Sequence, residues 1–245
     1  MSDDPTIASN VPTFTLHGMV RGGQRLLPVS AFVFPFGVAF GAAAIETGLS
    51  VDQAILMSMT MFAGASQFAA LDLWQTPLPF LSLALVVLAV NARHFILGAA
   101  ISPYVNPLPA KHWFASLMVL SDVNFADSYQ AMKQGERDAG HLMGGGLVLW
   151  SVWAIATTVG VFAGSLIGDL QRFGVDVVMA AFFAALAIGM VPNFRRAIPV
   201  LVACLVAVFS MDVLASGWNI IAAALAGGLA GVLDPKSVRE AKSYG

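Results

Sequence analysis

The chain alternates between long apolar runs and short polar stretches. Each run is close to the roughly 20 residues that a helix needs to cross a hydrocarbon core of about 30 Å. We expect membrane-spanning helices at 26–47, 51–71, 78–101, 112–130, 142–168, 175–192, 197–214 and 216–233. The pattern therefore predicts an all-α, polytopic integral membrane protein, a bundle of about eight transmembrane segments.

Composition agrees with this class. The 245 residues are 58% hydrophobic and 11% charged, whereas soluble proteins average about 45–50% and about 25%. We expect a cytoplasmic lead-in at 1–25, a transmembrane transport domain at 26–233 and a cytoplasmic tail at 234–245, with no room for a separate soluble domain.

Positive charges give the expected orientation. With eight crossings and a cytoplasmic N-terminus, only Lys111 and Arg172 fall on the outer side. Removing 112–130 as a crossing changes the count from nine against two to six against five, so we expect this polar segment to cross and both termini to be cytoplasmic. The nine residues on the cytoplasmic side are Arg21, Arg25, Lys133, Arg137, Arg195, Arg196, Lys236, Arg239 and Lys242.

Arg93 lies in the middle of the run 78–101, where every other residue except His94 is uncharged. A guanidinium keeps its charge in a protein, so at this depth it must face a partner, a water-filled cavity or an anionic ligand. Two interpretations remain open: a structural salt bridge to Asp122 or Asp127, and binding of a substrate carboxylate.

Segment 112–130 carries those two carboxylates. A carboxylate inside the membrane either pairs or takes up a proton. Asp122 lies nearer the middle of the run, whereas Asp127 is closer to cytoplasmic water. His94 is the other candidate, because histidine is the side chain that most readily exchanges a proton near neutral pH. Asp122, His94 and Asp127 are therefore the candidates for carrying a proton.

Neutral polar residues in the same half of the chain are candidates for substrate contact: Ser66, Gln67, Asn91 and Asn124. For Gln67 an interhelical hydrogen bond is an equally good explanation. Gly37 follows Pro35 near the centre of the first run, where either a functional break lining a cavity or a structural kink is expected. The glycines at 160–168 and 227–231 have the spacing of close helix packing.

Other classes of protein have weaker support. A pore or a scaffold subunit would use the buried charges only to hold the bundle. An intramembrane hydrolase would pair Ser66 with His94, but the sequence around Ser66 lacks the glycine of a Gly-x-Ser-Gly motif. The chain has neither a Gly-rich phosphate loop nor a His-Glu-x-x-His motif. We expect no enzyme activity, cofactor, metal or nucleic-acid partner.

Several of these motifs occur together in one family. The chain resembles the AzlC family, the large subunits of bacterial two-component exporters of branched-chain amino acids, from about Arg21 to Leu233. The motifs that carry the resemblance are Pro35-Phe-Gly37 with Gly41, Phe62-Ala-Gly-Ala-Ser-Gln-Phe68, Asn91-Ala-Arg-His94, Ser121-Asp122 with Phe125-Ala126, and Gly217-Trp218-Asn219.

The resemblance implies export of leucine, isoleucine, valine or a methionine-like substrate by proton antiport across the bacterial inner membrane, with a small AzlD-type membrane subunit. Arg93 would hold the substrate carboxylate and Asp122 or His94 the coupling proton. One departure is that Val123 stands where the family pattern has a Glu after the aspartate. A proton-carrying role of that Glu would fall to Asp122 or Asp127.

Overall fold

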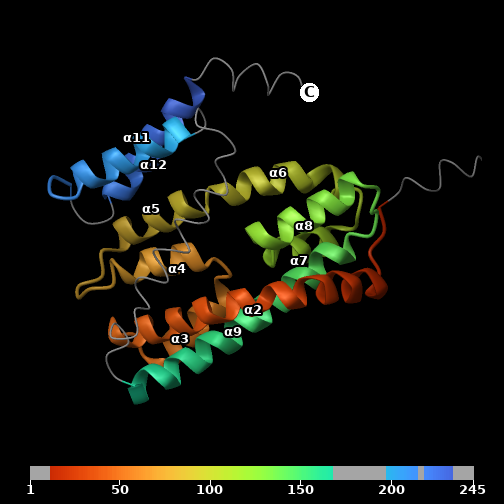
Figure 1. Cartoon of the computed structure of the whole chain (residues 1–245), viewed down its shortest axis with the longest axis horizontal. Helices are drawn as coiled ribbons and strands as arrows, with labels where there is room; N and C mark the ends of the chain where they lie inside the picture. The colour runs from red at the N-terminus through yellow and green to blue at the C-terminus, as the bar shows by residue number, and fades with distance from the viewer. Residues whose placement is uncertain (1–11, 168–196, 215–217, 234–245) are drawn as a thin grey trace, which may run out of the picture. The chain divides into compact units, whose positions relative to one another are not determined.

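The computed structural model describes residues 12–167, 197–214 and 218–233. The expected helix at 175–192 lies outside them. The chain divides into two compact units, unit 1 (1–67 and 91–169) and unit 2 (68–90 and 170–245). The helices (Figure 1) are α2 (Leu16–Glu46), α3 (Val51–Thr60), α4 (Gly64–Leu71), α5 (Phe80–Asn91), α6 (Arg93–Val105), α7 (Ala110–Met118), α8 (Asp122–Lys133), α9 (Gly140–Ile167), α11 (Ala197–Ser210) and α12 (Trp218–Val232).

Three helical stretches in the described residues are long and apolar enough to cross a membrane. They are Leu16–Glu46, Phe80–Val105 (α5 with α6) and Gly140–Ala163. The helices α11 and α12 are apolar but shorter. The prediction of an all-α protein with membrane-spanning helices is confirmed, whereas the expected segments 51–71 and 112–130 are each divided into two short helices.

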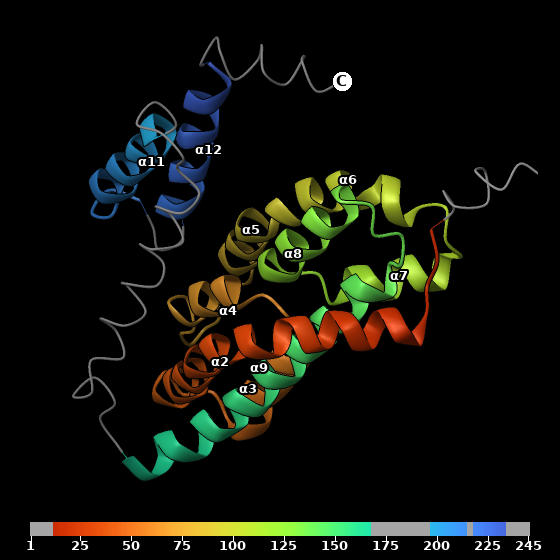
Figure 2. The same ribbon diagram turned by 45° about the vertical axis from the view of Figure 1, so that its right-hand side comes forward.

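The helices α2 and α9 lie side by side and run in the same direction (Figures 1 and 2). A Cβ atom on Gly22 would lie 2.0 Å from the carbonyl oxygen of His141, and one on Gly41 would lie 2.1 Å from that of Thr157. On α9, a Cβ on Gly160 would lie 2.0 Å from the carbonyl oxygen of Val38. Glycines thus let the two backbones touch, and the predicted packing role of Gly160 is confirmed.

The helix α2 continues through Pro35 and Gly37 without a break. Of the two alternatives for this position, a functional break and a structural kink, the break is not present, since the helix ends only at Glu46. A Cβ on Gly37 would lie 2.6 Å from the Cβ of Ala156 on α9. The glycine therefore serves the contact between the two helices.

The α2 helix begins at Leu16, well before the apolar run that starts at residue 26, because its N-terminus is capped. The Thr15 hydroxyl accepts a hydrogen bond from the Gly18 amide at 3.0 Å, as an N-cap residue does. The Asp138 carboxylate, just before α9, accepts hydrogen bonds from the Thr15 hydroxyl and from the Thr15 and Gly140 amides, the last two at 3.0 and 2.9 Å. The starts of α2 and α9 are thereby joined.

The polar segment 112–130 folds back on itself as the helical hairpin α7–α8. Near its beginning, the His112 ring stacks on Phe14, which precedes α2, with 4.4 Å between ring centroids. Beyond its end, the Arg137 carbonyl accepts a hydrogen bond from the Thr13 amide at 2.9 Å. Both ends of the hairpin therefore lie beside the start of α2. The segment is therefore not one continuous helix, because the chain turns at 119–121.

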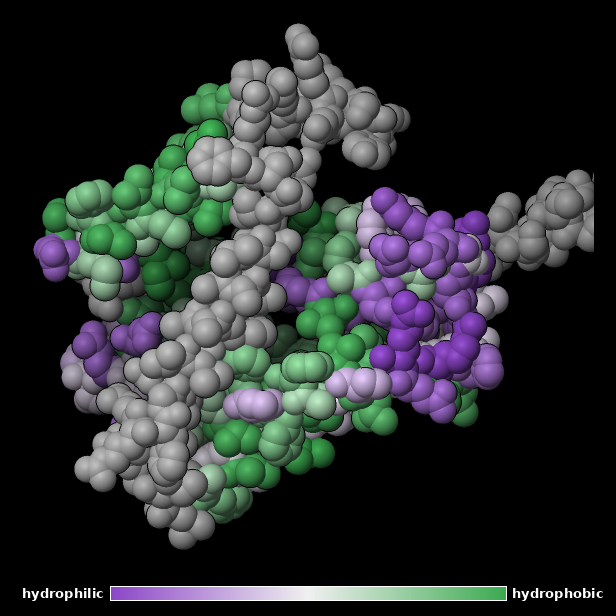
Figure 3. Space-filling model, viewed as in Figure 1, coloured by the Kyte–Doolittle hydropathy of each residue, from purple (hydrophilic) through white to green (hydrophobic). Residues whose placement is uncertain are grey.

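The end of α6 lies at the same end of unit 1. Ile101 and Val105, both fully buried, share an apolar cluster with Leu120, Met132 and Leu142. The Tyr104 ring meets the Tyr129 ring edge-on at 6.2 Å. The helices α6 and α8 therefore run in the same direction, from the Arg93–Asp122 level towards the start of α2. Figure 3 shows hydrophilic residues gathered at this end of the unit.

The segment 51–71 breaks at 61–63 between α3 and α4. The Gln67 side chain reaches back to donate a hydrogen bond to the Ser58 hydroxyl at 3.0 Å. A straight helix would place these residues about 13 Å apart, so the chain changes direction sharply at the break.

In unit 2, a Cβ on Gly227 of α12 would lie 3.0 Å from the Pro199 carbonyl oxygen of α11, which confirms close packing at this glycine.

Candidate functional site

Arg93 and Asp122 form an ion pair in the middle of unit 1. The Nη1 atom of Arg93 lies 2.9 Å from Oδ2 of Asp122, and the side chains are 35% and 43% exposed. Arg93 lies at the centre of the 26-residue stretch Phe80–Val105, where α5 ends and α6 begins. The structural salt bridge, one of the two interpretations of Arg93, is thus present, but the pair is not sealed in the core.

The N-terminus of α8 holds Asp122 in place. Ser121 caps the helix in a capping box with Asn124: each side chain bonds to the other residue's backbone amide. Asp122 is therefore the first residue of α8, where the positive end of the helix dipole favours a carboxylate. One atom of Arg93, Nε, is buried without a hydrogen-bond partner in the described part of the chain.

Ser66 and Asn91, the latter two residues before Arg93, are brought together. The Asn91 Nδ2 atom donates to the Ser66 hydroxyl at 3.1 Å, and this hydroxyl also donates to the Ala63 carbonyl at 2.9 Å. The Nδ1 atom of His94 lies 3.3 Å from the Asn91 backbone oxygen. Ser66 is thus bonded to an amide, whereas the hydrolase alternative required it to bond with His94.

Gln67 belongs to a buried polar cluster between α3, α4 and α9. Its Nε2 donates to Ser58, its Oε1 accepts from the Trp153 indole at 3.0 Å, and the Ser58 hydroxyl bonds to Thr157 at 2.9 Å. Ser58, Gln67 and Thr157 are all fully buried. The interhelical hydrogen bond expected as an alternative for Gln67 is present.

Asn124 is likewise buried and bonded to the protein. Its Nδ2 donates to the carbonyls of Val119 and Leu142 at 2.9 and 3.2 Å, and its Oδ1 accepts from the Ser121 amide at 2.7 Å. These bonds satisfy a carbonyl at the turn of the α7–α8 hairpin and fasten α8 to α9.

Asp127 lies apart from Arg93, between two basic groups that sequence reasoning missed. Its Oδ2 lies 2.7 Å from Nε2 of His141, and its Oδ1 lies 2.5 Å from Nε of Arg25. His141 and Asp127 are 7% and 14% exposed in their side chains, and Arg25 is exposed. His141 and Arg25 stand at the margins of apolar runs, where loop residues are expected, and no spacing links them to Asp127.

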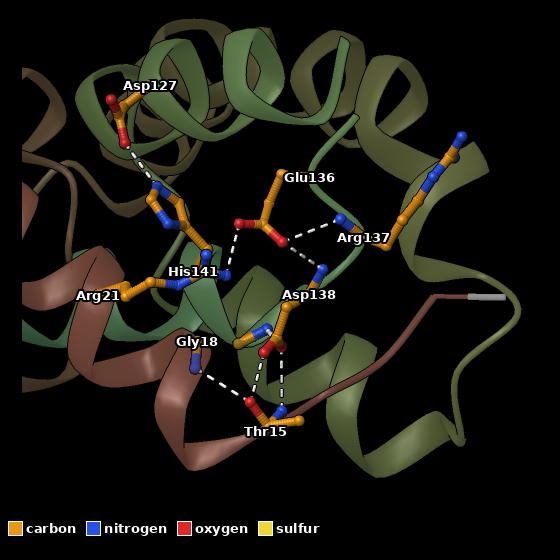
Figure 4. A network of polar contacts seen from close by, with 9 residues as sticks. Thr15, Gly18, Arg21, Asp127, Glu136, Arg137, Asp138 and His141 are labelled. Atoms are coloured by element: carbon orange, nitrogen blue, oxygen red, sulfur yellow. Dashed lines mark hydrogen bonds and ion pairs between the residues drawn. The ribbon is translucent and has the colours of Figure 1, made fainter. Parts of the chain in front are cut away.

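A second set of polar contacts lies beside this one (Figure 4). Arg21 pairs with Glu136 at 2.5 Å, and the Glu136 carboxylate also accepts from the Arg137 and Asp138 amides at 2.9 Å. Burial by itself raises the pKa of Asp138, but the hydrogen bonds from Thr15 and Gly140 and the charge of Arg21 outweigh it, so the pKa is lowered. This set fixes the α8–α9 connection against α2.

In the described residues, no group of three His, Cys, Asp or Glu side chains could hold a metal ion. The arrangement instead offers two charged sites on one helix. Asp122, at the start of α8, is paired with Arg93, and Asp127, further along, is paired with Arg25 and His141. Such a pair of sites can bind a charged solute and a proton.

The relatives found by comparison with known proteins are named as membrane or transport proteins. An uncharacterized membrane protein of Archaeoglobus fulgidus is 33% identical over 178 residues, 71% of this chain and 75% of the relative. The inner membrane protein YgaZ of Escherichia coli is 28% identical, over 72% of this chain and 74% of its own.

The branched-chain amino acid transport protein AzlC of Bacillus subtilis is 26% identical over 165 residues, 66% of this chain and 63% of its own. No solved structure matches significantly. The family model "AzlC protein" matches residues 28–167, which hold both charged sites except for Arg25. The chain therefore belongs to the AzlC family, as its motifs indicated.

Proposed function

We propose that the chain is the large subunit of a proton-driven exporter of branched-chain and methionine-like amino acids. It acts in the bacterial inner membrane together with a small AzlD-type membrane subunit. Membership of the AzlC family and the relative named as a branched-chain amino acid transport protein support the substrate class. The half-exposed ion pair between Arg93 and Asp122 is the observation that carries the proposal.

An amino acid is a zwitterion, and the ion pair has the matching charges. When the Arg93–Asp122 contact opens, the guanidinium takes the substrate carboxylate in charge-assisted hydrogen bonds and the Asp122 carboxylate takes the ammonium group. Each charge keeps a partner throughout, so the exchange avoids leaving an unpaired charge at mid-membrane. The unpartnered Nε of Arg93 gives a second donor for a bidentate contact.

In this proposal some neutral residues contact the substrate and others support the site. Asn91, two residues before Arg93, and Ser66, which is bonded to Asn91, orient the substrate. His94 and Asp122 are the groups proposed to take a proton. The supporting residues, which do not contact the substrate, are Gln67, Asn124 and Gly37. Gln67 is bonded to α3, Asn124 is bonded to the end of α7, and Gly37 packs against α9. Leu, Phe and Met side chains of the helices supply apolar surface for a branched side chain.

The proposal includes a topology of six crossings and two hairpins that enter the membrane from opposite sides. The hairpin α7–α8 enters from the cytoplasm, and α3–α4 from the outside. Lys111 then joins the nine cytoplasmic basic residues, so that ten stand against Arg172 alone. This charge bias is stronger than that of eight crossings and supports cytoplasmic termini.

The energy of the proton gradient is sufficient for export. Moving one elementary charge through about 100 mV yields about 2.3 kcal/mol, which supports a gradient of roughly fifty-fold. We expect saturable uptake of radiolabelled leucine into inverted vesicles that hold this chain and its small subunit. Uptake should require the proton gradient and be suppressed by isoleucine or methionine. Gradient-independent or absent uptake, with folded protein in the vesicles, would refute the proposal.

A further inference from the structure

We propose that Asp127, His141 and Arg25 form the proton-binding site of the transporter, and that α8 connects this site to the Arg93–Asp122 pair. The proposal rests on the proton-coupled export described above. It assigns the proton to a group, His141, that stands in a different helix from Asp122 and His94.

The hydrogen bonds fix which nitrogen of His141 is free to take a proton. A carboxylate only accepts hydrogen bonds, so the Nε2 atom facing Asp127 at 2.7 Å carries the hydrogen of the neutral ring. Nδ1 is then a bare acceptor. It is buried and has no hydrogen-bond partner in the described part of the chain. Protonation therefore adds one hydrogen at Nδ1 and converts the ring to imidazolium.

The charges around the site balance in the neutral state and change by one on protonation. Arg25 on α2 neutralises Asp127 on α8 while His141 on α9 is uncharged. After protonation two cations share one carboxylate. Among the neighbouring charged groups, Arg21 and Glu136 pair with each other, and Asp138 is held by Thr15 and Gly140. Lys133, in the last turn of α8, lies over the Tyr129 ring, and Arg137 follows Glu136 in the α8–α9 connection. The added positive charge of His141 therefore acts chiefly on the Arg25–Asp127 contact.

Three helices meet at this single carboxylate, so its contacts decide how α8 lies against α2 and α9. Asp122 stands five residues before Asp127 on α8, a rise of about 7.5 Å. The protonated ring of His141 competes with Arg25 for Asp127 and so shifts α8, and with it the carboxylate of Asp122 that receives the substrate ammonium. Proton and substrate thereby exclude each other, as antiport requires.

The test is binding of radiolabelled leucine to the purified full-length chain with its small subunit. Between about pH 8 and about pH 5.5, the range in which histidine changes charge, leucine should bind the unmodified protein about tenfold more weakly at the lower pH. His141→Gln and Asp127→Asn should each remove this pH dependence. His17→Gln, the same change at an exposed histidine of α2, should keep it.

Histidine-selective NMR separates this inference from the function on which it rests. The chain has four histidines, and His141→Gln identifies the His141 signal. If that signal changes protonation between about pH 5 and pH 8 while leucine does not bind at all, the proton site stands and the proposed substrate fails. If leucine binds and His141→Gln keeps the pH dependence, or if the His141 signal does not change, the inference is wrong. Retained elution volume on size exclusion shows that each variant is folded.

Discussion

Arg93 and Asp122 begin two helices, α6 and α8, that run in the same direction, and the 2.9 Å contact between Nη1 and Oδ2 joins the two starts. This relationship allows a test that separates a structural brace from a substrate site. Arg93→Gln and Asp122→Asn each leave one charge unpaired, and we expect a cost of about 1–3 kcal/mol in stability for each.

The double variant Arg93→Gln with Asp122→Asn removes both charges. We expect it to regain thermal stability in detergent, since no charge is left unpaired, but to keep a leucine uptake at least about tenfold below the unmodified protein. Recovery of uptake together with stability would show that the pair only braces the bundle.

The contact between α2 and α9 predicts the effect of a methyl group at Gly144. A Cβ there would lie 1.8 Å from the Met19 carbonyl oxygen, whereas nothing lies within 4 Å of a Cβ on Gly98. We expect Gly144→Ala to destabilise the protein by about 1–3 kcal/mol or more, because the helices must separate. Gly98→Ala, the matched control, should be neutral or slightly stabilising. Thermal unfolding in detergent measures both, and equal effects would contradict the packing described for α2 and α9.

The buried cluster around Gln67 predicts a cost for removing its amide. Gln67→Leu leaves the Trp153 indole N–H without its acceptor, and an unsatisfied buried donor costs about 1–3 kcal/mol. Gln130→Leu, at an exposed position of α8, is the control and should change stability little. The decisive comparison is the difference in melting temperature between the two variants, which should be clearly larger for Gln67→Leu.

The hydrogen bonds of the Asp138 carboxylate predict that the connection between α2 and α9 weakens in acid. Its pKa is lowered below 3.8 in the folded protein, so its contribution to stability is fully present above that value. The contribution is lost as the pH falls through the folded pKa. Asp138→Asn should lower stability at neutral pH and flatten the loss as the pH falls below about 4. Parallel unfolding curves of the two proteins over this range would contradict the assignment.

The hairpin α7–α8 predicts that Lys111 and Lys133 face the same side of the membrane. In a background with Cys204→Ser, single variants Lys111→Cys and Lys133→Cys should both react with an impermeant maleimide from the cytoplasmic side. Asp52→Cys, at the exposed start of α3, should react from the opposite side. Labelling of residues 111 and 133 from opposite sides would restore the single crossing.

Periodicity and charge in the sequence identify much of the fold but not its turns. The apolar runs predict where helices lie, and the lone arginine at mid-run predicts an ion pair with segment 112–130. The distribution of positive charge favours eight crossings over seven, but it favours six crossings with two hairpins still more, so it does not by itself reveal a turn within that segment. The divided helices could not be seen, since a break at 61–63 or 119–121 leaves hydropathy almost unchanged.

The three residues of the proposed proton site could not be linked to one another from the sequence either. Arg25, Asp127 and His141 lie far apart in the sequence, and their meeting depends on the parallel contact between α2 and α9. Glycine spacing indicated close packing for α9 but did not indicate its partner, and for α2 the sequence suggested a break or a kink instead. Asp127 alone had a visible signal, as a carboxylate within an apolar run.

The joined starts of α2 and α9 have a consequence for biosynthesis. Thr15 and Asp138 are separated by 123 residues, and a ribosome that adds about 5–20 residues per second needs about 6–25 seconds to make them. During that time α2 is in the membrane with its glycine face uncovered, its capping partner unmade and Arg25 unpaired. Among the helices that the structure describes, α2 therefore depends for its packing on the fifth apolar run, and a chain that stalls before residue 138 leaves α2 without these contacts.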